Sequence, residues 1–246
     1  MRYLILTDIH ANLEGLGACL TDARTRGYDE TLVLGDIVGY GPDPNAVIDL
    51  VRELKPRAIV RGNHDKVALG LNQADGFHPA ARAAAHWMLE SLSPENRAWL
   101  VELPMGPVVI DGEVEICHGS PFDEDAYIFD ELDARHAFDA ATTPVCFYGH
   151  THFAVVFRLV KDLLDVIGPP DGDTALTIEP GAKYLVNPGS VGQPRDGDPR
   201  AAYAIYDTAA KRVDLMRLPY PLEITQQKML KVGLPEPLAR RLALGR

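Results

Sequence analysis

Five short apolar segments of this chain are each followed directly by side chains of the kind that bind metal ions. Runs of this length that are rich in β-branched residues predict buried β-strands. In open α/β sheets, ligands bind beyond the carboxyl ends of the strands. The segments are Arg2–Thr7, Thr31–Leu34, Arg57–Arg61, Val114–Cys117 and Val145–Tyr148. The sequence therefore predicts that one sheet edge carries the polar residues Asp8, His10, Asp36, Asn63, His118, His150 and His152.

The first part of the chain predicts strands and helices in alternation. Asn12 is a suitable N-cap for a helix that Gly27 would end, because its side chain can accept a hydrogen bond from the first helical turn. Pro44 fits the first turn of a second helix, which Pro56 would end. The resulting β-α-β-α-β order predicts parallel strands with short connections on the ligand side.

The segment 66–107 differs from this alternating pattern. Its sequence predicts two helices, Ala80–Leu92 and Pro94–Leu103, between the third ligand segment and the next strand. We expect a helical insertion near the functional site. Since the chain of 246 residues shows no internal repeat and no linker, we expect one domain over residues 1–246.

The C-terminal half is expected to consist mainly of short strands, with a loop over Lys161–Thr174, where Asp, Gly and Pro are frequent. Two helices, near Leu222–Lys231 and Glu236–Leu244, are expected to close the chain. The strands predicted after residue 107 are Val108–Ile110, Val114–Cys117, Val145–Tyr148, Ala154–Leu159, Thr174–Ile178, Tyr184–Val186, Ala202–Tyr206 and Val213–Leu218.

The net charge of −11 argues against a stable nucleic-acid partner, because such binding depends on Lys and Arg neutralising phosphates. A small anionic substrate is compatible with this charge, since bound divalent cations can dominate the field at a site. No apolar run approaches the roughly 18 residues that a membrane helix needs, so we expect no membrane partner. Met1 leads into a predicted strand without a signal peptide, which predicts a cytoplasmic protein. A homo-oligomer is an open alternative.

The predicted ligand set suits two metal ions. Asp8 and His10 are two residues apart, as are His150 and His152, and on an extended backbone residues i and i+2 point in the same direction. Mixed nitrogen and oxygen ligands suit divalent or trivalent Mn, Fe, Zn, Co or Ni better than calcium. Seven ligands exceed the needs of one tetrahedral zinc and match two ions that share a carboxylate. Two ions about 3.5–4 Å apart stabilise both the attacking and the leaving oxygen in phosphoester hydrolysis.

Taken together and in chain order, these motifs resemble the calcineurin-like metallophosphoesterase superfamily. They are Asp8-x-His10, Gly35-Asp36, Gly62-Asn63-His64-Asp65, His118 and Gly149-His150-Thr151-His152. The segments 35–45 and 187–192 further resemble its prokaryotic phosphodiesterase-like branch. The resemblance implies an α/β (α+β) fold, a four-layer αββα sandwich of two mixed β-sheets flanked by helices. It also implies a phosphoesterase that acts on a small phosphorylated substrate or nucleotide.

The resemblance implies a role for each motif residue. One metal site would consist of Asp8, His10, Asp36 and His152, and the other of Asp36, Asn63, His118 and His150. Asp36 would bridge the two ions, and a bridging hydroxide would attack phosphorus. His64 would stabilise charge on the phosphate oxygens and act as general acid on the leaving group. Asp65 would orient His64.

Four further residues are candidates for contact with the substrate. Asn12 is either a helix cap or a phosphate contact, since a helix N-terminus also binds anions. Arg61 is either a structural residue at a strand end or a phosphate ligand. Asn187 and Ser190 lie in a segment that is either a tight turn or a wall of the active site. Arg195 could reach phosphate, although we expect its side chain to be solvated.

The preferred function is phosphodiester hydrolysis, with phosphomonoester hydrolysis as a further activity. The protein serine/threonine phosphatases carry Gly-Asp-x-Val-Asp-Arg-Gly, and Tyr40 occupies the arginine position here, which argues against a protein phosphatase. The sequence retains His64, so monoester activity stays an alternative. The remaining alternatives are a protein serine/threonine phosphatase, which Tyr40 makes less favoured, a dinucleoside polyphosphate hydrolase and a non-catalytic metal-binding scaffold. Pocket walls that set specificity are expected in segments 66–107 and 122–140.

Overall fold

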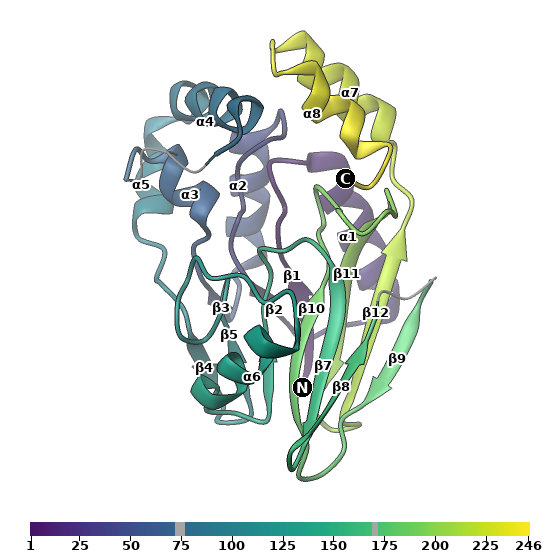
Figure 1. Ribbon diagram of the computed structural model, residues 1–246. Coiled ribbons are helices and arrows are strands. Elements are labelled where there is room, and N and C mark those ends of the chain that lie inside the picture. The colour runs from purple at the N-terminus through teal and green to yellow at the C-terminus, as the bar shows by residue number, and fades with distance from the viewer. Residues whose placement is uncertain (72–76, 169–171) are drawn as a thin grey trace.

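The computed structural model describes residues 1–71, 77–168 and 172–246. Two β-sheets pack face to face, and helices cover the outer faces (Figure 1). This arrangement confirms the predicted α/β fold of two mixed sheets flanked by helices. Within the described ranges, no helix combines the length and the apolar character that crossing a lipid bilayer requires.

The first sheet contains the parallel strands that the N-terminal sequence predicts. In order across the sheet, its strands are β3 (Ala58–Ile59), β2 (Glu30–Val33), β1 (Arg2–Leu6), β11 (Ala201–Asp207), β12 (Arg212–Leu218) and β9 (Thr174–Thr177). Strands β1, β2 and β3 are parallel, and the pairings β1–β11, β11–β12 and β12–β9 are antiparallel. The predicted β-α-β-α-β start is therefore confirmed.

The second sheet carries the later ligand segments. Its strands in order are β4 (Val108–Ile110), β5 (Val114–Ile116), β6 (Val145–Phe147), β10 (Lys183–Pro188), β7 (Ala154–Val160) and β8 (Leu163–Ile167). Strands β5, β6 and β10 are parallel, and the outer pairings are antiparallel. Each sheet thus has a parallel segment, and the metal-ligand candidates follow strands in these parallel segments.

Alternating side chains of β1 enter two different cores. Tyr3 and Ile5 pack between the two sheets, whereas Leu4 and Leu6 face the helices on the outer side. Both faces of the strand are therefore covered. A strand that is buried on both sides has a continuous apolar sequence instead of an alternating one. This explains why runs of β-branched residues predict the strands of this chain.

Three helices form the outer layers. Helices α1 (Leu13–Arg26) and α2 (Pro44–Leu54) pack on the first sheet through a core that includes Leu16 and Val47. Helix α6 (Glu131–Ala140) packs on the second sheet through Ala134, Ala137 and Phe138.

The remaining helices lie near the end of the sheets that carries the ligands. They are α3 (Asn63–Ala68), α4 (Pro79–Ser91), α5 (Pro94–Val101), α7 (Leu222–Lys231) and α8 (Glu236–Leu242). Figure 1 shows the yellow helices α7 and α8 at the same end of the molecule as α4, at the top of the view. Leu238 and Leu242 of α8 join Ala81 and Ala84 of α4 in one small core, which also includes Tyr40. The C-terminal helices are therefore packed beside the loop that follows β2.

Two expectations about local structure need correction. The segment Lys161–Thr174, expected as a loop, contains strand β8, and its residues 169–171 lie outside the described part. The short apolar sequence Leu163–Ile167 pairs with β7 as an edge strand, and the Asp, Gly and Pro residues around it concealed this signal. Helix α6 was not anticipated, because only a narrow face of its sequence, Ala134, Ala137 and Phe138, is buried.

Candidate metal centre and active site

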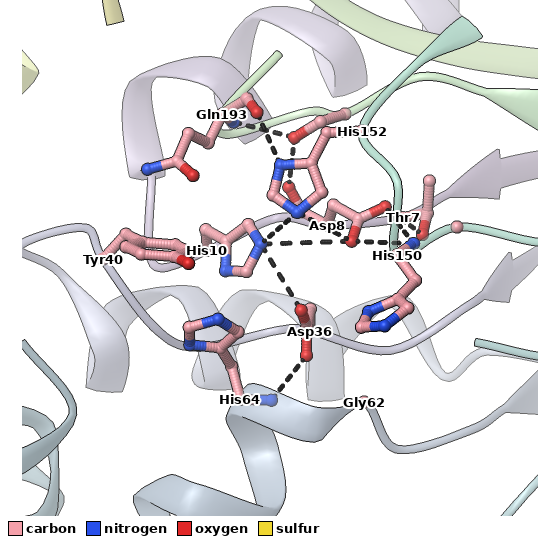
Figure 2. A network of polar contacts seen from close by, with 12 residues as sticks. Thr7, Asp8, His10, Asp36, Tyr40, Gly62, His64, His150, His152 and Gln193 are labelled. Atoms are coloured by element: carbon pink, nitrogen blue, oxygen red, sulfur yellow. Dashed lines mark hydrogen bonds and ion pairs between the residues drawn. The ribbon is translucent and has the colours of Figure 1, made fainter. Parts of the chain in front are cut away.

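The predicted metal ligands converge at one edge of the two sheets, after β1, β2, β5 and β6 and at the start of α3. Figure 2 shows Asp8, His10, Asp36, His150 and His152. The backbone brings them together by tight left-handed turns and not by the extended alternation that we expected. Five of them have φ between 49° and 68°: Asp8, His10, Asp36, His150 and His152. This conformation is uncommon for residues other than glycine and costs on the order of 1–3 kcal/mol each. Backbone strain of this kind gathers at functional sites.

The first ligand group consists of Asp8, His10, Asp36 and His152, all of them buried. One possible ligand atom from each residue lies within 4.8 Å of the others. The Nε2 atoms of His10 and His152 are 3.0 Å apart, and Nε2 of His152 lies 3.3 Å from Oδ1 of Asp8. The four side chains therefore point at one small volume, as Figure 2 shows.

The second group consists of Asp36, His118 and His150, with Asn63 beside it. Nε2 of His118 lies 3.5 Å from Oδ2 of Asp36 and 3.2 Å from Oδ1 of Asn63. His150 differs from the other histidines because its Nε2 lies 3.1 Å from the main-chain oxygen of Asp125. If that contact is a hydrogen bond from Nε2, the lone pair of Nδ1 is left to bind a metal.

Asp36 belongs to both groups, and one of its oxygens has the environment of a metal ligand. Oδ2 is buried and, within the described part of the chain, accepts no hydrogen bond. It lies 3.5 Å from Nε2 of His10 and 3.5 Å from Nε2 of His118, which come from the two different groups. A buried carboxylate oxygen without a partner is costly, and a cation on each side would satisfy it. The residues present therefore fit two metal ions that share Asp36.

Main-chain oxygens hold three of the histidine rings in place. Nδ1 of His10 lies 3.1 Å from the oxygen of Val38, and Nδ1 of His118 lies 2.8 Å from that of Leu34. Nδ1 of His152 lies 2.6 Å from the oxygen of Gln193. A hydrogen bond at Nδ1 fixes the tautomer and leaves the Nε2 lone pair for a metal.

The buried charges perturb one another strongly. Burial raises the pKa of Asp8 to about 7, and the nearby Asp36 adds to this rise. Burial lowers the pKa of His118, but Asp36 and Asp8 outweigh this effect and raise it to about 10. Burial acts to raise the pKa of Asp36, yet His118 and His64 hold it well below its usual value. Burial and the charges of neighbouring ligand candidates thus shift the pKa values of all three groups.

A cavity of about 280 Å³ adjoins both ligand groups. Its walls include Asp36, Asn63 and His150, together with His64. A larger, mainly apolar cavity of about 440 Å³ lies elsewhere, beside Lys183 and Tyr206, and includes none of the ligand candidates. The smaller cavity is the candidate active site, because only this one of the two brings polar side chains and metal ligands together.

Several side chains in this cavity were not identified from the sequence. Tyr127 stacks on His150 with 3.9 Å between ring centres, and Phe77 contacts His64 at 4.6 Å. Arg241 of α8 also lines the cavity, together with Arg195, which the sequence indicated could reach phosphate although a solvated side chain was expected. No motif marks Arg241, since it reaches the site only through the packing of α8 against α4 and Tyr40. Phe77 and Tyr127 fall within the two segments that were expected to form pocket walls.

His64 lies in the cavity wall with its ring against Tyr40, at 4.3 Å between ring centres. Gly39, with φ of +105°, permits this approach, because a Cβ there would come within 2.7 Å of Nδ1 of His64. Nε2 is therefore the nitrogen on the side away from Gly39. Burial lowers the pKa of His64 to about 4, so the ring of the free protein is neutral at pH 7.

Asp65 was expected to orient His64, but its carboxylate has other partners. Its Oδ1 accepts a hydrogen bond from the main-chain N–H of Val38, and its Oδ2 accepts one from Gly62. Both oxygens thus hold the two loops that carry Asp36 and Asn63, and neither contacts the ring of His64. Asp65 positions the ligand loops instead of orienting His64.

Two of the four predicted substrate contacts are engaged elsewhere. The side chain of Asn12 caps α1 by accepting from the N–H of Gly15, and it donates to the main-chain oxygen of Gly192. The helix-cap interpretation is therefore confirmed. Arg61 makes two hydrogen bonds of 3.0 Å each to the carboxylate of Glu124, so its guanidinium is bound by an acidic partner and is structural.

The other two predicted contacts build the loop behind the ligands. Asn187 donates to the main-chain oxygen of Gly149 and to the hydroxyl of Thr151. Ser190 donates to the main-chain oxygen of Asp8 at 2.8 Å. Both side chains are fully buried. They stabilise the turns that present Asp8, His150 and His152, and they do not line the cavity.

A profile of the calcineurin-like phosphoesterase superfamily domain matches residues 1–211. The chain belongs to this superfamily. This membership agrees with the resemblance of the motifs, and it makes the chain a member of a group of hydrolases that act on phosphoester bonds. An uncharacterized protein of Methanocaldococcus jannaschii is 35% identical to it over 248 residues, which cover 98% of this chain and 97% of that protein.

Solved structures of similar proteins support the same assignment. A metallophosphoesterase from Sphaerobacter thermophilus is 43% identical, with a TM-score of 0.88, and the match covers 100% of this chain and 99% of that chain. A hypothetical protein from Pyrococcus horikoshii shares the fold at 21% identity, with a TM-score of 0.79 and coverage of 100% and 98%. The calcineurin-like phosphoesterase fold therefore extends over the whole chain.

Proposed function

We propose that this chain is a metal-dependent phosphodiesterase with a centre of two metal ions. The observation that carries this proposal is the buried Oδ2 of Asp36, which lacks a hydrogen bond from the described residues and faces a histidine of each ligand group. Asp8, His10 and His152 would hold one ion, and Asn63, His118 and His150 the other, among Mn, Fe, Zn, Co and Ni. When bound, such ions supply Lewis-acid stabilisation and a nucleophilic water.

His64 is the side chain that we assign to the leaving group. In the free protein its ring is neutral and can donate one N–H to a phosphate oxygen. A phosphate oxyanion beside the ring would favour the imidazolium and raise the pKa of His64. The protonated ring could then pass its Nε2 proton to the oxygen of the departing alcohol.

Tyr40 supports a diester preference over a monoester preference. A monoester carries one more negative charge than a diester, and Tyr40 stands where the related protein phosphatases have an arginine that grips this charge. Its ring packs 4.8 Å from that of His10 and 4.3 Å from that of His64. An aromatic side chain thus fills this position beside the ligands, and the arginines of the cavity lie farther out, with each guanidinium carbon 5.6 Å from the centre of the Tyr40 ring.

Hydrolysis of two chromogenic esters tests this proposal. The protein is freed of metal by chelation and dialysis and then loaded with Mn²⁺, and its turnover of bis-p-nitrophenyl phosphate is compared with that of p-nitrophenyl phosphate. We expect metal-dependent hydrolysis of both, with higher kcat/KM for the diester. A preference for the monoester would contradict the diester assignment. Two bound ions per chain without turnover of either ester would favour the non-catalytic scaffold.

A further inference from the structure

Two arginines from distant parts of the chain line the cavity beside the candidate metal centre. Arg195 follows β10, and Arg241 belongs to α8. The guanidinium carbon of each lies 5.6 Å from the centre of the Tyr40 ring. Tyr40 also contacts the rings of His10 and His64. The two positive charges are thus connected to the candidate metal centre through a single aromatic ring.

Neither guanidinium has an Asp or Glu carboxylate within ion-pair distance in the ranges that the structure describes. Nη2 of Arg195 donates to two neutral oxygens, the Tyr40 hydroxyl at 3.2 Å and the side-chain oxygen of Gln193 at 3.0 Å. Nε of Arg195 is buried and has no partner among the described residues. Nε of Arg241 donates to the main-chain oxygen of Arg246, which is the last residue and therefore carries the terminal carboxylate.

This arrangement is unusual for a chain in which acidic residues outnumber basic ones, 35 to 24. Arg61, by comparison, does not line the cavity and is neutralised by Glu124. Burial, together with the charge of Arg195, lowers the pKa of Arg241 to about 10. The terminal carboxylate offsets one of the two guanidinium charges, so the arginine pair keeps a net positive charge that an anion would neutralise.

We propose that Arg195 and Arg241 bind a second phosphate group of the substrate, beside the phosphate that is hydrolysed. Guanidinium groups match the geometry and charge of phosphate oxygens. The hydrolysed phosphate belongs at Asp36, Asn63 and His150, whereas the arginines lie on the Tyr40 side of the same cavity. This inference rests on the proposed phosphoester hydrolysis, and it narrows the substrates to esters with at least two phosphate groups.

Anion binding to the metal-free protein tests the arginine site without catalysis. Isothermal titration calorimetry with inorganic tripolyphosphate should show binding that Arg195→Gln and Arg241→Gln each weaken by about 10- to 100-fold, since each loses a charged hydrogen-bond donor. Arg240→Gln is the matched control. Arg240 lies next to Arg241 in α8 but is exposed and paired with Glu236. Equal affinity in the wild type and all three variants would overturn the proposal.

Two substrates that contain the same nucleosides but different numbers of phosphates test whether the arginines bind the second phosphate or the hydrolysed one. Diadenosine tetraphosphate carries several phosphates, whereas adenylyl-(3′→5′)-adenosine carries one. With metal bound, we expect a higher kcat/KM for the tetraphosphate, and we expect each cavity variant, but not Arg240→Gln, to reduce the ratio of the two values by about 10- to 100-fold. A proportional loss on both substrates would place the arginines at the hydrolysed phosphate and would overturn the proposal.

The two experiments also distinguish this inference from the proposed function. Tripolyphosphate binding that depends on both arginines, without hydrolysis of any ester, would support the anion site and contradict the phosphodiesterase. Metal-dependent hydrolysis with an unchanged substrate ratio in the variants would support the phosphodiesterase and contradict the anion site. Circular dichroism of each variant establishes that it is folded before either comparison is made.

Discussion

Arg217 and Asp196 form an ion pair in which each side chain is only 1% exposed. Arg217 belongs to β12 of the first sheet, and Oδ2 of Asp196 also accepts a hydrogen bond from the N–H of Ala154 in β7 of the second. The loop that contains Asp196 also supplies Gln193, which holds the ring of His152. The ion pair therefore ties this loop to both sheets close to the candidate metal centre.

Replacing one partner of this pair should be costly. Arg217→Met would leave the carboxylate of Asp196 buried without its cation, and we expect a loss of about 3–5 kcal/mol in the free energy of unfolding. The double variant Arg217→Met/Asp196→Leu should recover much of this loss, because no unpaired charge remains. Urea unfolding at pH 7 measures both effects. A single variant as stable as the wild type would show that the pair contributes little.

A second ionic cluster holds the loop that carries Tyr127. Glu124 accepts two hydrogen bonds from Arg61 and one of 2.9 Å from Nζ of Lys66 in α3. Lys66 also pairs with Asp125, whose main-chain oxygen lies 3.1 Å from Nε2 of His150. The cluster thus connects α3 with the loop beside the second ligand group.

The stability that Glu124 provides should depend on pH. Burial acts to raise the pKa of Glu124, but Arg61 and Lys66 outweigh it and hold this pKa below its usual value of 4.5. The folded protein then binds fewer protons at Glu124 than the unfolded chain does, so the stabilisation is present above about pH 4.5 and is lost as the pH falls further. Glu124→Gln should therefore lower the free energy of unfolding by about 1–3 kcal/mol at pH 7.

Urea unfolding of the wild type and of Glu124→Gln between pH 7 and pH 3 checks this dependence. The difference between the two proteins should shrink below pH 4.5. Glu95→Gln serves as control, because Glu95 pairs with Arg52 on the surface, with a side chain that is 76% exposed, and should change stability little. A difference that is constant with pH would show that Glu124 acts through packing and not through its charge.

Much of the fold was readable because the ligand-bearing strands are buried on both faces. The continuous apolar runs of β1 and β2 predicted the strands, and the polar residues after them predicted the ligand edge. The expected geometry, in which the paired ligands alternate along an extended backbone, was only partly right. Asp8 and His10 converge through left-handed turns, which depend on close packing of loops from both sheets and leave no periodic signal in the sequence.

The cavity walls were harder to predict because they depend on contacts between distant segments. Arg241 reaches the cavity through the packing of α8 on α4, more than 140 residues away in sequence. Arg61 presents the opposite case. Its position beside the ligand loop suggested a phosphate contact, but a carboxylate 63 residues later neutralises it. These contacts join residues that are far apart in the sequence, so residue type and local sequence do not predict them.

Loss of the shared carboxylate oxygen should remove metal from the centre. Asp36→Asn keeps an oxygen that can accept the hydrogen bond from the N–H of His64, which Oδ1 accepts at 2.8 Å. The other oxygen, which lies between the two ligand groups, is replaced by an amide NH₂ group that cannot bind a cation. We expect fewer than two ions per chain and loss of most turnover, measured by elemental analysis and diester hydrolysis. Asp139→Asn, on the exposed side of α6, should retain both ions. Two ions per chain in Asp36→Asn would contradict the shared position.

Removing the ring of His64 should separate metal binding from catalysis. His64 is not part of either ligand group, and only its main-chain N–H contacts Asp36. His64→Ala should therefore retain two ions per chain, while kcat for a diester with an alkyl leaving group falls by about 10²- to 10⁴-fold if the ring protonates the leaving group. His86→Ala, at an exposed position in α4, is the matched control and should retain the wild-type kcat. A substrate whose leaving group needs no proton, such as a p-nitrophenyl ester, should be less affected than an alkyl ester. An equal fall for both esters would assign His64 to binding of the phosphate oxygens instead of proton transfer.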